Sequence, residues 1–370
     1  MYIHQRQDWP KFHWNQETIT PQLALVRHQQ GRLMGRMEGI GFKFREFAVL
    51  DTLTQDILKT SEIEGEFLDR DMVRSSIAKR LGLDIGALAP ADRNIEGIVE
   101  MMLDATQNFA SPLTRNRLFS WHKSLFPSGK SDLVTIKTGS WRDDRIGPMQ
   151  VISGPIGKET IHFEAPSAKR LDREMDLFLD WFGNQGKTDP VLKAGLAHFW
   201  FVTVHPFEDG NGRIARAIAD MCLAQSEASP KRVYSMSAQI RLERKKYYNI
   251  LEQTQKGMLD VTAWLEWFLG CLGRAIANTQ DTLSTVLSKA FFWEAHEGEA
   301  FNDRQRRILN LLLDGFEGKL QSSKWAKLGK CSQDTANRDI NDLVNRGILK
   351  KDSSGGRSTS YSIIQEVQKS

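Results

Sequence analysis

A twelve-residue loop at 205–216 constrains this chain more than any other stretch, because it separates two apolar runs of helix-prone sequence. The first run covers residues 197–204 and the second covers 214–223. Gly210 and Gly212 allow backbone angles that other residues avoid, and they leave no side chain in the way of a ligand. A glycine loop that opens a helix points several N–H groups at one spot, where the helix dipole adds positive potential. The stretch therefore predicts an anion-binding loop between two helices.

Charged side chains in the same loop suit phosphate chemistry. Arg213 and Arg216 stand three residues apart, so they share one helix face and can hold separate phosphates. Asp209 offers a hard oxygen ligand for Mg²⁺, and His205 can accept a proton near neutral pH. The alternative is a polar turn between helices with a buried histidine.

The loop resembles the signature of the Fic family, H-x-F-x-[DE]-G-N-G-R-x-x-R, which residues 205–216 match at every fixed position. The resemblance implies a mainly α fold, a Fic-type helical bundle with a β-hairpin flap. It also implies transfer of AMP from ATP to a hydroxyl of a target protein. In that reaction His205 would remove the proton of the hydroxyl, and Asp209 would hold Mg²⁺ on the α- and β-phosphates.

The resemblance assigns the phosphate contacts to the rest of the loop. Asn211 and the backbone amides of Gly210 and Gly212 would line an anion hole. Arg213 would bind the β-phosphate, and Arg216 would bind the γ-phosphate.

A second stretch, residues 60–66, is acidic and contains Gly65, a residue suited to ending a helix. Its composition alone indicates an acidic turn between helices. Thr60, Glu64 and Gly65 also match the inhibitory motif of the Fic family, [ST]-x-x-x-E-[GN]. The resemblance implies that Glu64 pairs with Arg216 and takes the guanidinium that the γ-phosphate needs.

Short β-prone segments at 151–155 and 160–163 flank a turn with Gly and Pro, which predicts a β-hairpin. This is either a structural edge hairpin or the flap of the Fic family, which holds the target backbone beside the active site by strand addition. Residues 164–166 depart from the commoner Pro-Pro pattern after the flap, so the resemblance does not define the target. The residues that the resemblance assigns to cover the nucleotide are Val151, Ile152, Ser153 and Gly154.

An amphipathic helix is predicted at 241–252, with the adjacent tyrosines Tyr247 and Tyr248. Such a pair either packs in the core or borders a ligand. Fic relatives carry Tyr-Tyr-x-x-Leu here, followed by an amide that borders the adenine. Gln255 stands where Asn is usual. Because aromatic faces and an amide suit a purine, the resemblance implies that these three residues contact the adenine.

The C-terminal residues 301–370 read as three short helices and a two-strand hairpin, a pattern that resembles a winged helix-turn-helix. With 13 Lys/Arg and 8 Asp/Glu, this part has a net charge of +5. One interpretation is DNA binding through a helix at 332–345, with Arg338 and Arg357 near phosphates. The other is protein docking or self-association, because that helix also carries three aspartates.

These patterns divide the sequence into an N-terminal arm and helix at 1–45, a Fic core at 46–296 and a winged-helix domain at 301–370. The landmarks expected within the core are the inhibitory helix around 60–65, the flap at about 148–166 and the signature loop at 205–216.

Composition is that of a soluble globular protein, with 40% hydrophobic residues, 26% charged residues and a net charge of +4. Three cysteines stand far apart without metal or disulfide spacing, which suits a reducing cytoplasm. The N-terminus has no apolar signal core, and eighteen apolar residues never run together. We therefore expect a cytoplasmic protein without a membrane partner.

The sequence predicts a protein adenylyltransferase (AMPylase) that uses ATP and Mg²⁺ to modify a Tyr, Ser or Thr hydroxyl of a target protein, with Glu64 as its brake. Removal of AMP at the same site and assembly into a homo-oligomer are both compatible with these residues. The alternative is a DNA-binding regulator whose Fic core senses a nucleotide.

Overall fold

The computed structural model divides into two units, residues 1–280 and residues 281–370. The long helix α11, Thr262–Ala295, contributes to both. The structure describes every residue except 40–41, 84, 86–89, 132–133, 146, 156, 185, 187, 314–315, 317, 353–358 and 365–370, and it leaves out the side chains of 42–43, 280–287 and 290. Arg357, a predicted phosphate contact, lies outside the described residues.

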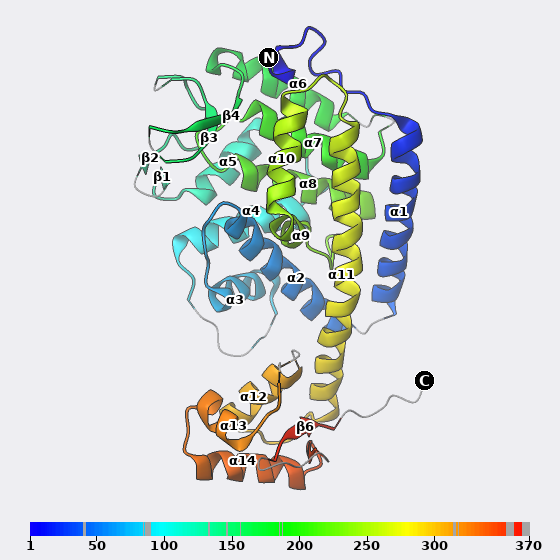
Figure 1. The fold of residues 1–370 in the computed structure, drawn as a ribbon, viewed down its shortest axis with the longest axis vertical. Helices are drawn as coiled ribbons and strands as arrows, with labels where there is room; N and C mark the ends of the chain where they lie inside the picture. The colour runs from blue at the N-terminus through cyan, green and yellow to red at the C-terminus, as the bar shows by residue number, and fades with distance from the viewer. Residues whose placement is uncertain are drawn as a thin grey trace. The chain divides into compact units, whose positions relative to one another are not determined.

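Helices dominate the first unit, which confirms the prediction of a mainly α fold (Figure 1). None of the helices in the described part of the chain is both long enough and apolar enough to span a membrane. The α-helices before α11 are α1 (Gln16–Glu38), α2 (Phe42–Ile63), α3 (Arg70–Leu81), α4 (Arg93–Gln107), α5 (Arg115–Leu125), α6 (Leu171–Gly183), α7 (Pro190–Val204), α8 (Asn211–Glu227), α9 (Met236–Leu242) and α10 (Arg244–Gln255). Short 3-10 turns lie at Ile3–Gln5 and Ala168–Arg170.

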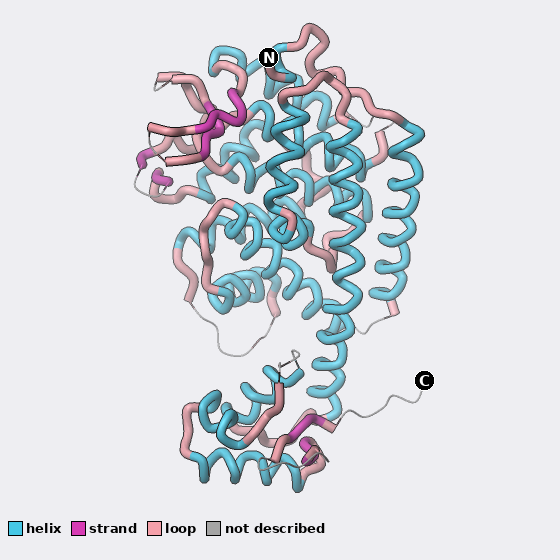
Figure 2. The backbone as a smooth tube through the Cα atoms, viewed as in Figure 1, coloured by secondary structure: helices cyan, strands magenta, loops and turns pink. Residues whose placement is uncertain are grey.

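Two small antiparallel strand pairs lie together at one side of this unit, as Figure 2 shows. The first joins β1 (Lys130–Ser131) to β2 (Val134–Thr135). The second joins β3 (Gln150–Ser153) to β4 (Thr160–Glu164), and its register shifts after Val151. The second pair is the hairpin predicted from the β-prone segments.

Helices α7 and α8 form the centre of the first unit and carry the loop between their ends. Asp189 caps α7 by accepting the Val191 N–H at 2.8 Å, and Pro190 fits the first turn because its missing N–H is not needed there. Gly195 lets α11 approach closely, since a Cβ there would lie 3.0 Å from the ring of Phe268. The start of α7 is therefore capped, and its N-terminal half packs closely on α11.

The predicted helix at 241–252 is broken in the structure. Helix α9 ends at Leu242 and α10 begins at Arg244, with Glu243 between them at φ −104° and ψ 20°. The carboxylate of Glu243 accepts two hydrogen bonds from Arg274 of α11, at 2.6 and 2.7 Å. This tertiary contact fixes the break, which helical periodicity alone does not reveal.

The N-terminal arm packs on the main body of the first unit. His4 Nε2 donates to the carbonyl oxygen of Glu164 at 2.8 Å, so the arm reaches the end of β4. Trp9 Nε1 donates to Glu174 of α6 at 2.7 Å. The ring of Phe12 packs edge-on against aromatic rings of α7.

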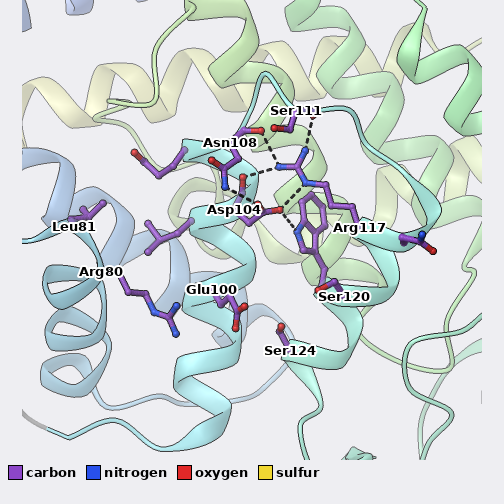
Figure 3. A pocket seen from close by; sticks show the side chains of 13 residues that line it. Arg80, Leu81, Glu100, Asp104, Asn108, Ser111, Arg117, Ser120 and Ser124 are labelled. Atoms are coloured by element: carbon purple, nitrogen blue, oxygen red, sulfur yellow. Dashed lines mark hydrogen bonds and ion pairs between the residues drawn. The ribbon is translucent and has the colours of Figure 1, made fainter.

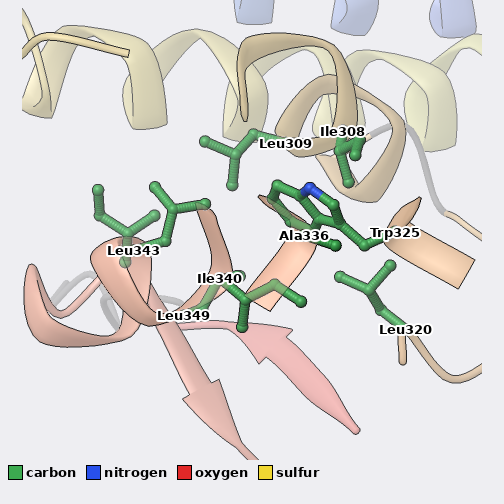
Figure 4. Close-up of a cluster of buried hydrophobic side chains, with 9 residues drawn as sticks. Ile308, Leu309, Leu320, Trp325, Ala336, Ile340, Leu343 and Leu349 are labelled. Atoms are coloured by element: carbon green, nitrogen blue, oxygen red, sulfur yellow. The ribbon is translucent and has the colours of Figure 1, made fainter. Parts of the chain in front are cut away.

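The second unit has its own core. It contains α12 (Asp303–Leu313), α13 (Ser322–Gly329), α14 (Gln333–Asn345) and the antiparallel pair of β5 (Leu349–Lys351) and β6 (Tyr361–Ile363). Phe292 and Trp293 of α11 pack against its apolar cluster. The fully buried members of the cluster, most of them labelled in Figure 4, are Ile308, Leu309, Leu320, Trp325, Ala336, Ile340, Leu343, Ile348 and Leu349.

Candidate active site

His205 lies just past the end of α7 with left-handed backbone angles, φ 51° and ψ 59°. Its Nδ1 is 3.1 Å from the carbonyl oxygen of Val202. Because a carbonyl can only accept, Nδ1 carries the ring proton and Nε2 keeps its lone pair. Burial, with the nearby charge of Arg142, lowers the pKa of His205 from 6.5 to about 4. The imidazole is therefore neutral at pH 7 and can accept a proton at Nε2.

Arg142, which the sequence analysis did not identify, fixes the backbone at His205 and at the residue after it. Its Nε donates to the carbonyl oxygen of His205 at 2.7 Å, and its own N–H donates to that of Pro206 at 2.9 Å. Its Nη2 donates to the carbonyl oxygen of Pro166, at the end of the flap. Arg142 is 3% exposed and pairs with Asp144 at 3.0 Å. It thereby joins the base of the flap to the loop.

Two further side chains hold the interior of the loop. Asn211 accepts the N–H of Phe207 at 3.0 Å and donates to its carbonyl oxygen at 2.8 Å. His122 lies 3.2 Å from the carbonyl oxygen of Asp209, and its ring stacks on Phe207 with centroids 4.1 Å apart. The side chain of Asn211, predicted to line an anion hole, is thus used within the loop. The amides that α8 leaves without an intrahelical partner at its start remain available to an anion.

Asp209 can serve as a Mg²⁺ ligand only together with other oxygens. One carboxylate oxygen accepts the Gly210 N–H at 2.6 Å, and the other accepts the Ser131 hydroxyl. The side chain is 45% exposed. Within the described residues, no group of three His, Cys, Asp or Glu side chains could hold a metal ion. The residues fit Mg²⁺ that takes its remaining ligands from phosphate and water, as this ion commonly does.

Arg216 points at the end of α2. Its Nε donates to the Thr60 hydroxyl at 2.6 Å, and its Nη2 donates to the Thr60 carbonyl oxygen at 3.0 Å and to Glu64 at 2.7 Å. The arginine is 2% exposed. Burial is the largest influence and opposes its charge, but Glu64 together with Tyr247 and Tyr248 outweighs burial and raises the pKa of Arg216. The three residues of the predicted inhibitory contact therefore lie together.

Arg213 is held by other partners. Its Nη1 donates to Glu66 at 2.8 Å, its Nη2 lies 4.0 Å from Asp209, and its guanidinium lies over the ring of Phe126 at 5.1 Å. Among the described residues, Arg213 Nε and Arg216 Nη1 are buried without a hydrogen-bond partner. Buried N–H groups without acceptors favour a ligand that brings oxygens to them.

Gly212 leaves room for the Glu64 carboxylate to approach the backbone of α8 closely. A Cβ at this position would lie 2.3 Å from the carboxylate oxygen Oε1 of Glu64. The carboxylate therefore lies against the first turn of α8, where free N–H groups and the helix dipole attract anions. Gly210 has a φ of 78°, and a Cβ there would lie 2.9 Å from the ring of Phe126.

The flap residues Val151, Ile152, Ser153 and Gly154 lie on β3 and in the turn that follows it. In the described part of the chain, no hydrogen bond or ion pair links these four residues to the loop at 205–216. The hairpin is tied to α10 instead. Ser153 Oγ lies 2.6 Å from His162 Nε2, and His162 Nδ1 lies 2.7 Å from Glu252.

The predicted adenine contacts divide into a buried and an exposed group. Tyr247 is 1% exposed, and its hydroxyl lies 2.8 Å from His198 Nε2. Gln255 is 4% exposed and donates to the Thr203 hydroxyl at 3.2 Å. Tyr248 is 36% exposed. Burial and the nearby charge of Glu64 raise the pKa of Tyr248. Of the three, only Tyr248 offers an accessible ring beside the Glu64 site.

A surface pocket of about 830 Å³ lies elsewhere, against α3, α4 and α5 (Figure 3). Its main charges are already paired, because Asp104 accepts hydrogen bonds from Arg117 at 2.7 Å and from Trp121 at 2.6 Å. Arg80 in its wall pairs with Glu96 at 2.6 Å. The pocket includes no residue of the signature loop.

Comparison with known proteins places the loop inside a recognised domain. Residues 112–223 match the model of the Fic/DOC family, and residues 2–83 match a domain of unknown function (DUF4172). A curated protein adenylyltransferase Fic of Culex quinquefasciatus is 30% identical over 229 residues, which cover 60% of this chain and 40% of that protein. A curated protein adenylyltransferase Fic of Nematostella vectensis is 29% identical over 113 residues, which cover 30% of this chain and 25% of that protein. The chain thus spans less than half of each relative.

Two crystal structures share the fold. A Fic family protein from Desulfovibrio desulfuricans aligns with a TM-score of 0.55 at 20% identity, covering 96% of this chain and 99% of that one. A Fic domain-containing signaling protein from Bacteroides thetaiotaomicron aligns with a TM-score of 0.52 at 18% identity, covering 75% and 100%. The signature loop at 205–216 lies within residues 112–223, which match the model of the Fic/DOC family, and the fold is that of the two solved Fic structures.

Proposed function

We propose that this protein is an ATP-dependent protein adenylyltransferase that modifies a Tyr, Ser or Thr hydroxyl of a target protein. One observation carries the proposal: a neutral imidazole with a free Nε2 lies in the same loop as two buried arginines at the start of α8. The names of the relatives support the same chemistry.

In the proposed reaction, the hydroxyl oxygen of the target attacks the α-phosphorus of ATP. The bond from that phosphorus to the oxygen bridging it to the β-phosphate breaks, and pyrophosphate leaves. His205 Nε2 takes the proton of the hydroxyl, which its neutral state and fixed tautomer permit. Arg213 and Arg216 stabilise the charge on the departing phosphates from the start of α8. When bound, Mg²⁺ at Asp209 would supply further neutralisation of phosphate charge.

We further propose that Glu64 acts as a built-in brake. Its carboxylate is 2.7 Å from Arg216 Nη2, at a place where a triphosphate would present its terminal group. A guanidinium paired with this carboxylate cannot form the same two-oxygen contact with a phosphate. ATP would then bind in a pose unsuited to transfer.

The test is incorporation of label from α-³²P-ATP into protein. We expect Glu64→Gly to increase labelling over the unmodified chain. In the Glu64→Gly background, His205→Ala should reduce labelling by about 10²- to 10⁴-fold, the usual contribution of a general base, while nucleotide binding persists. Labelling that survives the loss of His205 would reject the proposed reaction, and unchanged labelling in Glu64→Gly would reject the brake.

A further inference from the structure

A second carboxylate, Glu66, touches the other arginine of the signature. Glu66 Oε2 is 2.8 Å from Arg213 Nη1, and the two side chains are 40% and 9% exposed. Glu64 and Glu66 thus engage the two arginines of α8 in parallel, one carboxylate to each guanidinium. Only the Glu64 contact was expected from the sequence.

The backbone after α2 explains how residues 64 and 66 reach the same helix. The carbonyl oxygen of Ser61 accepts the N–H groups of both Glu64 and Glu66 at 3.0 Å. Gly65 between them has a φ of 92°, which L-residues rarely adopt, although no atom would obstruct a Cβ there. Glycine is needed for the turn itself. The turn directs two side chains, two positions apart, toward arginines that stand three positions apart on α8.

We propose that Glu66 is a second inhibitory residue, which occupies Arg213 as Glu64 occupies Arg216. This inference rests on the proposed function, because it concerns the same nucleotide site. Arg213 is more than nine-tenths buried and keeps one N–H without an acceptor in the described residues. A phosphate that binds Arg213 must displace the carboxylate of Glu66 or share the guanidinium with it.

The proposal gives a role to the N-terminal part of the chain. Both glutamates lie within residues 2–83, the match to a domain of unknown function. The same part contacts the carbonyl oxygen of Glu164 at the end of the flap through His4. The turn between α2 and α3 places one carboxylate on each of the two arginines.

If each glutamate blocks one arginine, changing Glu64 or Glu66 should affect the affinities for different nucleotides. Calorimetric titration of the full chain with ATP, ADP and AMP measures these affinities. If Arg213 receives the β-phosphate and Arg216 the γ-phosphate, Glu66→Gln should tighten the binding of both ATP and ADP by up to about fivefold, the upper end for a partly exposed charged pair. Glu64→Gln should tighten ATP more than ADP. Neither change should alter the affinity for AMP.

Glu62→Gln is the matched control. Glu62 lies in the same segment but pairs with Lys59 at 2.6 Å and Arg241 at 3.5 Å, so its loss should leave all three affinities unchanged. Glu66→Asp provides a second variant, because it keeps the charge but shortens the side chain by one methylene and should give a smaller gain for ADP.

The outcomes distinguish this inference from the proposed function. If Glu66→Gln leaves the ATP and ADP affinities unchanged while Glu64→Gly still increases labelling, Glu66 is not inhibitory and the transfer reaction stands. If Glu66→Gln increases the affinity for ADP but no variant labels protein, the inhibitory role of Glu66 stands and the transfer reaction is wrong. If none of the variants binds ADP, both the inhibitory role of Glu66 and the proposed nucleotide site are rejected.

Discussion

His122 Nε2 donates a hydrogen bond to the carbonyl oxygen of Asp209, 3.2 Å away, while its Nδ1 accepts the N–H of Gly139 at 3.1 Å. The two partners define the tautomer, since an N–H can only donate and a carbonyl can only accept. His122 is fully buried and stacks on Phe207. It therefore positions the loop that carries the proposed Mg²⁺ ligand without touching the reacting atoms.

We predict that His122→Ala impairs transfer through the loop rather than through the fold alone. Loss of the bond and of the buried ring should reduce the free energy of unfolding by about 1–3 kcal/mol. Measured in the Glu64→Gly background, kcat should fall more than KM for ATP rises, because a displaced Asp209 affects the transition state most.

His122→Gln is the control for this prediction, since its amide can still donate to the carbonyl oxygen of Asp209. Recovery of kcat in His122→Gln relative to His122→Ala supports a positioning role. Equal kcat values in the two variants, at equal stability, would contradict it.

Buried histidines predict a loss of stability in mild acid. Burial lowers the pKa of His122 from 6.5 to about 4 and that of His198 from 6.5 to about 3. Below pH 6.5 the unfolded chain therefore binds more protons than the folded chain, so the free energy of unfolding rises with pH in this range. The contribution of the two neutral histidines to the free energy of unfolding is fully present above about pH 7 and is lost as the pH falls toward 4.

Urea unfolding at pH 7.5, 6 and 5 measures this dependence. Each of the two histidines contributes a slope of up to about 1.4 kcal/mol per pH unit below its unfolded pKa. His122→Gln removes one of the buried histidines with a lowered pKa, which also include His198 and His205, so its slope between pH 6 and 5 should be smaller than that of the unmodified chain. A slope that is unchanged in His122→Gln would show that His122 does not titrate as described.

The residues of the signature loop could be singled out from the sequence because they are contiguous. Asp209, Arg213 and Arg216 lie on one short segment whose glycines and helix start are visible in the sequence. The α2 end was predictable for a similar reason, since Thr60 and Glu64 stand one helical turn apart.

Residues that support the loop from elsewhere could not be predicted in this way. Arg142 lies 63 positions from His205, and Glu66 lies 147 positions from Arg213. Neither has a local pattern that marks its role, because each acts only through a tertiary contact. The local motif around Tyr247 predicts an adenine contact, but it does not reveal that the hydroxyl of Tyr247 is buried against His198.

A buried ion cluster anchors α2 to the rest of the first unit. Arg232 Nη2 lies 3.0 Å from Asp56 of α2 and 2.7 Å from Asp220 of α8, and the three side chains are 5%, 0% and 1% exposed. Burial raises the pKa of Asp220, and the charge of Asp56 adds to this effect. The cluster is therefore sensitive to the loss of any one member.

We predict that Asp56→Ala reduces the free energy of unfolding by about 3–5 kcal/mol, because it leaves the charge of Arg232 buried with one partner fewer. Asp51→Ala is the matched control on the same helix. Asp51 pairs with Arg70 at 2.8 Å, where the side chains are 21% and 51% exposed, so its loss should cost no more than about 1 kcal/mol. Equal losses in the two variants, measured by urea unfolding, would contradict the account of the cluster.

Removal of the second unit should leave the proposed transfer reaction intact, because no residue of the candidate site lies beyond Gln255. The position of the cut matters. Phe292 and Trp293 pack against the apolar cluster of the second unit, so a chain that ends at residue 300 exposes both rings. A chain ending at residue 280 removes them, and a chain ending at 300 with Phe292→Ser and Trp293→Ser provides a second design.

In the Glu64→Gly background, both shortened chains should incorporate label from α-³²P-ATP. Helical circular dichroism and cooperative melting serve as the controls for folding. A shortened chain that folds but does not label would show that the second unit contributes to catalysis.

The full chain carrying His205→Ala tests the alternative of a DNA-binding regulator. If residues 301–370 contact duplex DNA, it should retain a gel shift that weakens steeply with added salt, and the chain ending at 280 should lose that shift.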